Sequence, residues 1–184
     1  MGLVKVLGIG VSAAAVIFHT PLRQFISNVF GDKIVPATGS IVYCRLTPVA
    51  EHSGVYVGDG KIVHRDGAGY LEVVSPQKFI ARLNGKNNAV SIYVSCCGKD
   101  AAGSKEVAER ALAAVRAPRH GGYSLLFKNC HQFCKYCLTG GEQKTRDFSF
   151  MSLEHTLKKV YKFNKWREWE TKTYTDWVCN AIKQ

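Results

Sequence analysis

Residues 52–64 carry the pattern that most restricts the fold of this chain, because two short β-type runs face each other across a tight turn. Residues 52–57 and 61–64 are rich in β-branched and aromatic side chains, and Gly-Asp-Gly separates them. Runs of this kind joined by turn residues predict an antiparallel hairpin. Side chains alternate between the two faces of a strand, so the hairpin decides which residues can meet.

A histidine stands at each end of the predicted hairpin, at His52 and His64. With a three-residue loop, Val57 opposes Lys61. Gly54 then opposes His64, and the two histidines become diagonal neighbours on one face. Such neighbours lie roughly 7–8 Å apart, within reach of imidazole rings. A two-residue loop would place them on opposite faces. A three-residue loop with a left-handed glycine is a common hairpin type, so we expect facing histidines.

Later in the chain, a cysteine opens a short predicted helix at Cys130. Asn129 is a good helix-capping residue, and Gly140 is typical of a helix end. A thiol in the first turn lies at the positive end of the helix dipole, which favours the thiolate. Each residue alone is more often a buried structural group than a catalyst. Together, however, Cys130, His52 and His64 have the residue types of a thiol catalyst.

Residues 51–60 (EHSGVYVGDG), 63–64 (VH) and 129–133 (NCHQF) carry a family resemblance. They resemble the lecithin:retinol acyltransferase (LRAT) family, which includes the H-Ras-like suppressor phospholipases and acyltransferases. The resemblance runs from about residue 36 to about residue 138. It implies a circularly permuted papain-like fold, in which the histidines precede the cysteine in the chain, as they do here.

The resemblance also implies a role for each candidate site residue. Cys130 would be the nucleophile that accepts the acyl group, and His52 the general base that takes the thiol proton. His64 would be the third member, which orients or polarises the first imidazole. Backbone N–H groups at the start of the cysteine helix would bind the oxyanion. The resemblance implies no cofactor and no metal.

Four positions depart from the family pattern. Ser53 stands where the family usually has an aromatic residue, and Ser40 where it often has an acidic one. His131 and Gln132 follow Cys130 where the family typically has Glu and His. None of these changes removes the nucleophile or either predicted histidine. We expect them to bear on the substrate.

The cysteine helix also permits a metal-binding interpretation. Cys130, Cys134 and Cys137 have the spacing with which radical S-adenosylmethionine enzymes hold an iron–sulfur cluster. That motif lies early in a large partial barrel, and too few residues follow Cys137 to build one. Zinc would need a second ligand pair at finger-like spacing, which the sequence lacks. We therefore expect Cys134 and Cys137 to be small core residues behind the nucleophile.

The number and placement of the cysteines bear on the cellular compartment. There are seven, an odd number, and the adjacent Cys96 and Cys97 fit a disulfide framework poorly. We therefore expect free thiols and a reducing, cytoplasmic compartment for the catalytic domain. A chain of 184 residues has room for one domain and shorter appendages.

The formal net charge of +11 predicts an anionic partner. No nucleic-acid-binding motif is recognisable, so we expect a membrane surface and no nucleic acid. An apolar run at residues 6–18 supports this expectation, although it is shorter than the ~20 residues that span a bilayer. It permits a marginal span, a signal-peptide core, an interfacial anchor or a buried helix.

Basic residues alternate with Trp, Tyr and Phe in residues 155–169. This composition suits a membrane headgroup interface, and equally a solvated helix whose aromatic rings pack on the domain. The chain thus divides into three predicted parts. They are an apolar N-terminal anchor or signal segment at 1–30, an LRAT-like catalytic domain at 36–140, and a basic, aromatic C-terminal extension at 141–184.

The region between the two motifs predicts further strands and one helix. We expect strands at 70–74 and 90–94, a turn at 84–88 and an amphipathic helix at 104–116. The inward-facing residues of that helix would be Val107, Ala108, Ala111, Leu112 and Val115. Strands followed by helices predict an α+β fold, with an antiparallel sheet packed against helices and a possible N-terminal membrane helix.

These inferences predict a membrane-associated lipid acyltransferase or phospholipase A-type hydrolase. It would take an acyl group from a phospholipid or another acyl donor onto Cys130 as a thioester. Water, an amine or an alcohol would then accept the group. Two alternatives stay open: an NlpC-type cysteine peptidase or amidase on the same permuted scaffold, and a non-catalytic membrane-binding module. The sequence does not indicate which oligomeric state the protein adopts.

Overall fold

The structure is a computed structural model that describes residues 33–47, 50–81, 91–117, 129–141, 147 and 149–170. The chain divides into two compact units, Met1–Asp32 and Lys33–Gln184, and every described residue belongs to the second. The predicted N-terminal segment and the predicted turn at 84–88 therefore lie outside the described residues. Within the described ranges, no helix is long and apolar enough to cross a membrane.

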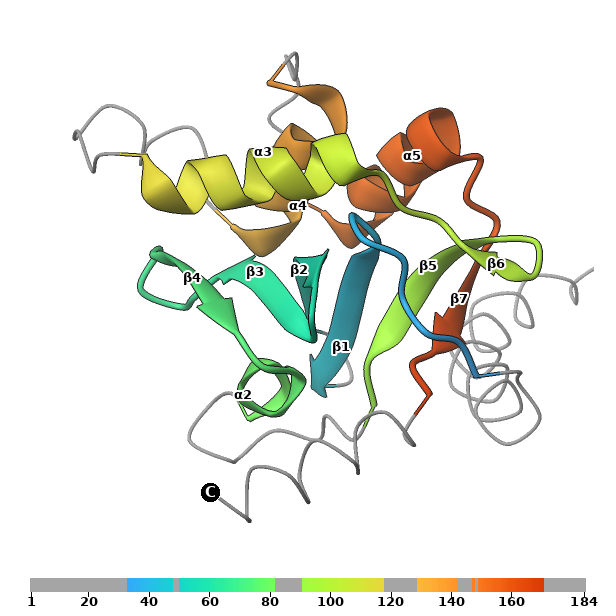
Figure 1. The fold of residues 1–184 in the computed structure, drawn as a ribbon, viewed down its shortest axis with the longest axis horizontal. Helices are drawn as coiled ribbons and strands as arrows, with labels where there is room; N and C mark the ends of the chain where they lie inside the picture. Colours follow the sequence, from blue (N-terminus) through green and yellow to red (C-terminus); the bar gives the residue numbers. More distant parts are fainter. Residues whose placement is uncertain are drawn as a thin grey trace, which may run out of the picture. The chain divides into compact units, whose positions relative to one another are not determined.

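A seven-stranded sheet with antiparallel strand pairs forms the centre of the described fold (Figure 1). The strand order is β4-β3-β2-β1-β5-β6, and β7 also pairs with β5. The strands are β1 (Ile41–Thr47), β2 (Ala50–Gly58), β3 (Lys61–Arg65), β4 (Leu71–Val74), β5 (Tyr93–Cys97), β6 (Asp100–Ala101) and β7 (Lys165–Glu168).

Helices cover both faces of this sheet (Figure 1). Helices α3 (Lys105–Arg116), α4 (Cys130–Thr139) and α5 (Phe150–Tyr161) lie over one face. The short helix α2 (Pro76–Ile80) lies on the opposite face, next to β3 and β4. The predicted antiparallel sheet packed against helices is therefore confirmed.

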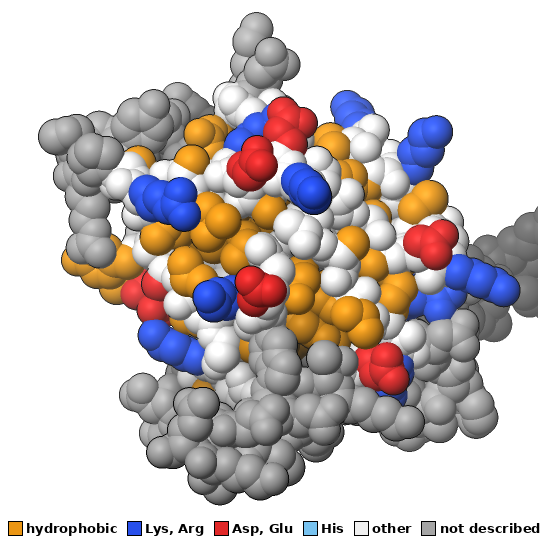
Figure 2. Space-filling view, viewed as in Figure 1, with side chains coloured by type: hydrophobic (Ala, Val, Ile, Leu, Met, Phe, Trp, Pro, Cys, Tyr) orange, Lys and Arg blue, Asp and Glu red, His pale blue; other side chains and the backbone are white. Residues whose placement is uncertain are grey.

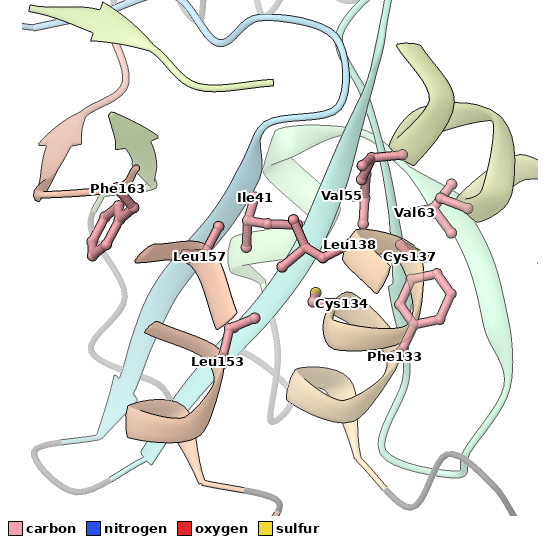
Figure 3. Close-up of a cluster of buried hydrophobic side chains, with 12 residues drawn as sticks. Ile41, Val55, Val63, Phe133, Cys134, Cys137, Leu138, Leu153, Leu157 and Phe163 are labelled. Atoms are coloured by element: carbon pink, nitrogen blue, oxygen red, sulfur yellow. The ribbon is translucent and has the colours of Figure 1, made fainter. Parts of the chain in front are cut away.

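One hydrophobic core lies between the sheet and the three helices, where side chains from α4 and α5 meet those of β1, β2 and β3 (Figure 3). Cys134 and Cys137 are fully buried in it, which confirms them as small core residues. Burial raises the pKa of both thiols. The buried members of this core are Ile41, Val55, Val63, Val107, Ala111, Phe133, Cys134, Cys137, Leu138, Leu153, Leu157 and Phe163.

A second core on the α2 face buries the other side of the central strands. Its members are Val42, Cys44, Ile62, Val74, Phe79, Ile92, Val94 and Trp169. Successive residues of β1 therefore enter different cores, Ile41 on the α4 face and Val42 on the α2 face. Because both faces of the central strands are buried, a shift of one residue in any of them would exchange the two sets of side chains.

Two predicted elements between the motifs are found where expected. All five side chains predicted to face inward from helix α3 do so. Three of them are buried and two are partly buried. The strand predicted at 70–74 is β4. The strand predicted at 90–94 is wrong in its boundaries, because β5 runs from Tyr93 to Cys97. The strands β6 and β7 both pair with Cys96, and this pairing extends β5 toward its C-terminal end.

The segment 155–169 continues α5 and then forms β7. The Trp166 ring packs against the rings of Tyr43 and Phe163, with centroids 4.7 and 4.8 Å apart. Trp169 is buried against Tyr56. The aromatic rings thus pack on the domain, as one alternative predicted, although residues 165–168 form a strand and not a helix.

The turn between β2 and β3 is shorter than predicted. Gly58 pairs with Lys61, so the loop consists of Asp59 and Gly60 alone. Both loop residues have positive φ, 45° and 61°, which a type I′ turn requires. Asp and Gly both tolerate this conformation and so permit the tighter turn. The expected pairing of Val57 with Lys61 is therefore wrong.

A β-bulge in β2 compensates for the shorter turn. The pairing register shifts after Tyr56, so that Val57 is an extra residue in β2. Beyond the bulge, Gly54 pairs with His64 as predicted. One residue fewer in the loop and one more in the strand cancel, so His52 and His64 still share a face.

Gly54 lies in a space that admits no side chain, which gives a first prediction. A Cβ at Gly54 would lie 2.7 Å from Ile62 Cγ2, 2.9 Å from Val63 O and 3.0 Å from Phe79 Cε2. We expect Gly54→Ala to lower the free energy of unfolding by about 1–3 kcal/mol, because the backbone oxygen and the Phe79 ring must move. Urea unfolding measures this loss.

Gly98→Ala is the control for this substitution. It adds the same methyl group where no heavy atom lies within 4 Å, so only the positive φ of 63° opposes it. We expect the smaller loss at Gly98. An equal or smaller loss at Gly54 would contradict the close packing between β2 and α2.

Candidate active site

The two predicted histidines are in direct contact. His52 Nε2 and His64 Nδ1 lie 2.9 Å apart, and the rings meet edge to face with centroids 4.9 Å apart. Both side chains are buried, with His64 fully enclosed. The predicted pairing of the two rings is confirmed, and its geometry is that of a hydrogen bond between imidazoles.

Helix α2 supplies an apolar wall against this pair. Ser75 caps the helix by accepting a hydrogen bond from the Lys78 N–H, and Pro76 occupies its first turn, where a missing N–H costs nothing. The helix presents Phe79, whose ring centroid lies 4.9 Å from that of His52 and 5.6 Å from that of His64. This ring shields one side of the imidazole pair from water.

Glu72 extends the histidine pair toward the surface. It is the direct cross-strand partner of His64, and its Oε1 lies 3.2 Å from His64 Nε2. Its other oxygen, Oε2, accepts a hydrogen bond of 2.7 Å from Lys78 Nζ. The hydrogen bond from Lys78, and secondarily the charge of His64, lower the pKa of Glu72. Glu72 is therefore an ionised acceptor at neutral pH.

Sequence reasoning missed Glu72 as part of the site. The residue lies in the strand predicted at 70–74, and pairing that strand with the histidine hairpin would have placed it opposite His64. That pairing register is the signal that could have identified it.

Cys130 is the first residue of α4, and both predicted caps of this helix are confirmed. Asn129 Oδ1 accepts a hydrogen bond of 2.9 Å from the Gln132 N–H. At the other end, Gly140 adopts the left-handed conformation with φ 73° and donates its N–H to Tyr136 O. The Cys130 side chain is half-buried at the positive end of the helix.

The sulfur of Cys130 contacts His131, and neither of the predicted histidines. Cys130 Sγ lies 3.8 Å from His131 Nδ1, and among the described residues no hydrogen bond joins it to His52 or His64. The alternation along β2 explains this arrangement, since Ser53 faces α4 and its neighbour His52 faces α2. The structure thus brings the two histidines together but leaves Cys130 outside their hydrogen-bond chain.

Two of the positions that depart from the family pattern contact each other. Ser53 Oγ lies 2.8 Å from His131 Nδ1, and the Cys134 thiol donates to Ser53 Oγ over 3.4 Å. The His131 ring also packs edge-on against Phe150, with centroids 5.4 Å apart. Sequence reasoning noted both departures without connecting them, because their contact depends on how α4 docks on β2.

Burial determines the charge of His131. The side chain is almost fully enclosed, and desolvation lowers its pKa to about 4. His131 is therefore neutral at pH 7. A group with so low a pKa holds a proton poorly, so it is better suited to accept or donate a hydrogen bond near Cys130 than to take the thiol proton.

The described ranges contain no group of three or more His, Cys, Asp or Glu residues placed to hold a metal ion. The six described cysteines are free thiols. Cys134 and Cys137 are two of the three cysteines whose spacing resembles an iron–sulfur motif. Their side chains lie in the core between α4 and the sheet.

The low pKa of His131 gives a prediction for stability. Between about pH 6.5 and pH 4, the unfolded chain binds a proton at this position and the folded chain does not. Stability therefore falls as the pH falls through this window, by up to about 3 kcal/mol from this residue. We expect His131→Gln to flatten the pH dependence of the urea midpoint between these limits.

The matched control is His155→Gln, because His155 is exposed on α5 and has no place in the core. Equal pH dependence in wild type and His131→Gln would contradict a neutral, buried His131.

Comparison with known protein families gives a match for this chain. The family model described as Lecithin retinol acyltransferase matches residues 35–143, more than half of the chain. The matched range includes both predicted histidines, Glu72 and the helix that carries Cys130. Searches among curated proteins and among solved structures gave no match. The family match confirms the resemblance, and the chain belongs to the lecithin retinol acyltransferase family.

Proposed function

We propose that this protein is a thiol-dependent lipid acyltransferase or phospholipase A-type hydrolase that works through a thioester on Cys130. The observation that carries the proposal is the family match over residues 35–143, which supports acyltransferase or phospholipase-type chemistry. The chain order supports the circularly permuted papain-like arrangement, since the strands with His52 and His64 precede the helix with Cys130.

The proposed reaction has two steps. In the first, the Cys130 thiol loses its proton to a base, and the thiolate attacks the carbonyl carbon of a lipid ester. The C–O bond of the ester breaks, the lipid alcohol leaves with the proton, and the acyl group stays on sulfur. In the second step, water, an amine or an alcohol attacks the thioester. Backbone N–H groups in the first turn of α4 are suited to bind the oxyanion of both steps.

His52 is the base in this proposal, although His131 lies closer to the sulfur. The imidazolium form of His52 is supported by a chain that ends in the carboxylate of Glu72, whereas His131 lies in a buried site that disfavours its charged form. Catalytic hydrogen bonds are often long in a free enzyme and shorten when substrate binds. Cys130 contacts His131 and His52 faces α2, so the proposal requires the first turn of α4 to move until the Cys130 sulfur and the His52 ring meet.

The proposed site of action is an anionic membrane surface facing a reducing, cytoplasmic compartment. The net charge of +11 supports attraction to anionic lipid, and the free thiols of the described residues support the reducing compartment. Figure 2 shows Lys and Arg side chains spread over one face of the molecule, between acidic and apolar side chains. A diffuse distribution of this kind favours nonspecific attraction to a charged surface.

Intact-protein mass spectrometry tests the acyl-enzyme. After incubation with mixed phosphatidylcholine and phosphatidylserine vesicles and a brief acid quench, we expect a fatty-acyl adduct on the wild type that hydroxylamine removes. Cys130→Ala should carry none, because the nucleophile is absent. Cys97→Ala is the matched control, since Cys97 is a partly exposed free thiol on β5, and it should acquire the adduct like the wild type.

An adduct that persists in Cys130→Ala would contradict the assignment of the nucleophile. Absence of both adduct and released fatty acid would instead favour an NlpC-type peptidase or a non-catalytic membrane-binding module.

The choice of base is tested by the rate of adduct formation. We expect His52→Gln to slow acylation of Cys130 by roughly 10²- to 10⁴-fold, the usual contribution of a general base. His131→Gln should slow it by less than about tenfold, because a hydrogen bond near the sulfur contributes less than the base. The reverse order of the two rates would identify His131 as the base.

A further inference from the structure

Four side chains from four consecutive elements form one chain of polar contacts on the α2 face. It runs from His52 on β2 through His64 on β3 and Glu72 on β4 to Lys78 on α2. The successive distances are 2.9 Å, 3.2 Å and 2.7 Å. The antiparallel registers produce this chain directly, since Gly54 opposes His64 and His64 opposes Glu72.

We propose that Glu72 is a positioning residue that fixes the tautomers of both histidines, so that Nδ1 of His52 is the nitrogen that accepts the thiol proton. The inference rests on the proposed function and deepens it, because it names the proton-accepting atom and the group that selects it. Lys78 assists by binding the second oxygen of Glu72.

The hydrogen positions follow in turn from the carboxylate inward. An ionised carboxylate only accepts hydrogen bonds, so His64 Nε2 must carry a hydrogen and donate it to Glu72 Oε1. A neutral imidazole has one N–H, so Nδ1 of His64 is then an acceptor. His52 Nε2 must donate to it, which leaves the lone pair of His52 on Nδ1.

The proton transfer then balances without any further acceptor. The S–H bond of Cys130 breaks and an N–H bond forms at His52 Nδ1, while the hydrogen on His52 Nε2 stays in its bond to His64. The resulting imidazolium lies one imidazole away from the negative charge of Glu72. No proton passes to Glu72, which acts by orienting the rings and by its charge.

The charged groups around Glu72 are consistent with an ionised carboxylate. The hydrogen bond and the charge of Lys78 on α2 lower the pKa of Glu72, as does the protonated form of His64 on β3, while burial and the carboxylate of Asp66 in the β3–β4 loop oppose them. The Glu72 side chain is 32% exposed and that of Lys78 is 63% exposed. An ordinary exposed ion pair of this kind contributes little to stability, so its removal should leave the fold intact.

Nuclear magnetic resonance of the imidazole nitrogens tests the inference without any substrate. In the wild type we expect neutral His64 as the Nε2–H tautomer and neutral His52 with its hydrogen on Nε2. In Glu72→Gln we expect the single His64 tautomer to be lost, because an amide can either donate or accept. The pKa of His64 should also fall, since a neighbouring negative charge has been removed.

The kinetic counterpart is the rate of Cys130 acylation. We expect Glu72→Gln to lower kcat by roughly ten- to a hundredfold with little change in KM, because orientation of the base is lost while lipid binding is not. Lys78→Met should have a smaller effect in the same direction, because the carboxylate remains. Glu106→Gln on α3 is the matched control, since it removes a glutamate paired with Arg110 away from the histidines.

Each outcome decides the inference. An altered His64 tautomer together with a lower kcat supports it, whereas an unchanged tautomer in Glu72→Gln overturns it. An altered tautomer with an unchanged kcat also overturns it, because Glu72 then has no effect on the base. If the wild type forms no acyl-enzyme, the proposed function fails by itself, and the tautomer measurement still decides whether Glu72 orients the pair.

Discussion

The bulge at Val57 is the constraint on which the arrangement of the site depends. Asp59 and Gly60 form a two-residue turn, and in a regular hairpin this turn would direct His52 and His64 to opposite faces of the sheet. The extra residue in β2 restores the shared face, and the two imidazoles meet there at hydrogen-bond distance. Because both faces of the central strands are buried in hydrophobic cores, the alternative register would also place apolar side chains in the wrong core. Packing of the whole sheet thus holds the histidine pair in register.

The sheet separates two polar groups that differ in how they tolerate charge. On the α2 face, His52 and His64 are linked to a carboxylate that reaches the surface, so a proton gained by the pair faces a negative charge. On the α4 face, Ser53, His131 and Cys134 form a neutral cluster, and burial lowers the pKa of the imidazole to about 4. Three histidines in one small domain therefore differ in chemistry because of their surroundings. This difference supports acid–base work by the first group and hydrogen bonding by the second.

Features decided by local sequence could be predicted, whereas most features decided by strand pairing could not, and the pairing of Gly54 with His64 is the exception. Asn129 and Gly140 signal the ends of α4 by their own conformational preferences, and the spacing of Cys134 and Cys137 places both in the core. The bulge could not be predicted, because its position depends on how β2 and β3 settle against two cores at once. Glu72 was missed for a similar reason, since its place opposite His64 follows from a pairing between separate strands. Residues 165–168 become the strand β7 by pairing with β5, about 70 residues earlier in the chain. No local pattern indicates that pairing.

The contact between Ser53 and His131 also limits how Cys130 can approach His52. The later part of α4 is fixed, because Arg110 Nη1 donates to Cys137 O over 2.7 Å and the buried Lys135 donates to Asp147 O and Ser152 Oγ.

The first turn of α4 is held to β2 by the hydrogen bonds of Ser53 with His131 and Cys134. With both parts anchored, the helix cannot shift as a rigid body without breaking buried hydrogen bonds. An approach of the Cys130 sulfur to His52, which faces α2, must therefore break the hydrogen bonds that hold this first turn to β2. The serine at position 53 makes this anchor possible, because its hydroxyl joins the His131 imidazole and the Cys134 thiol by hydrogen bonds.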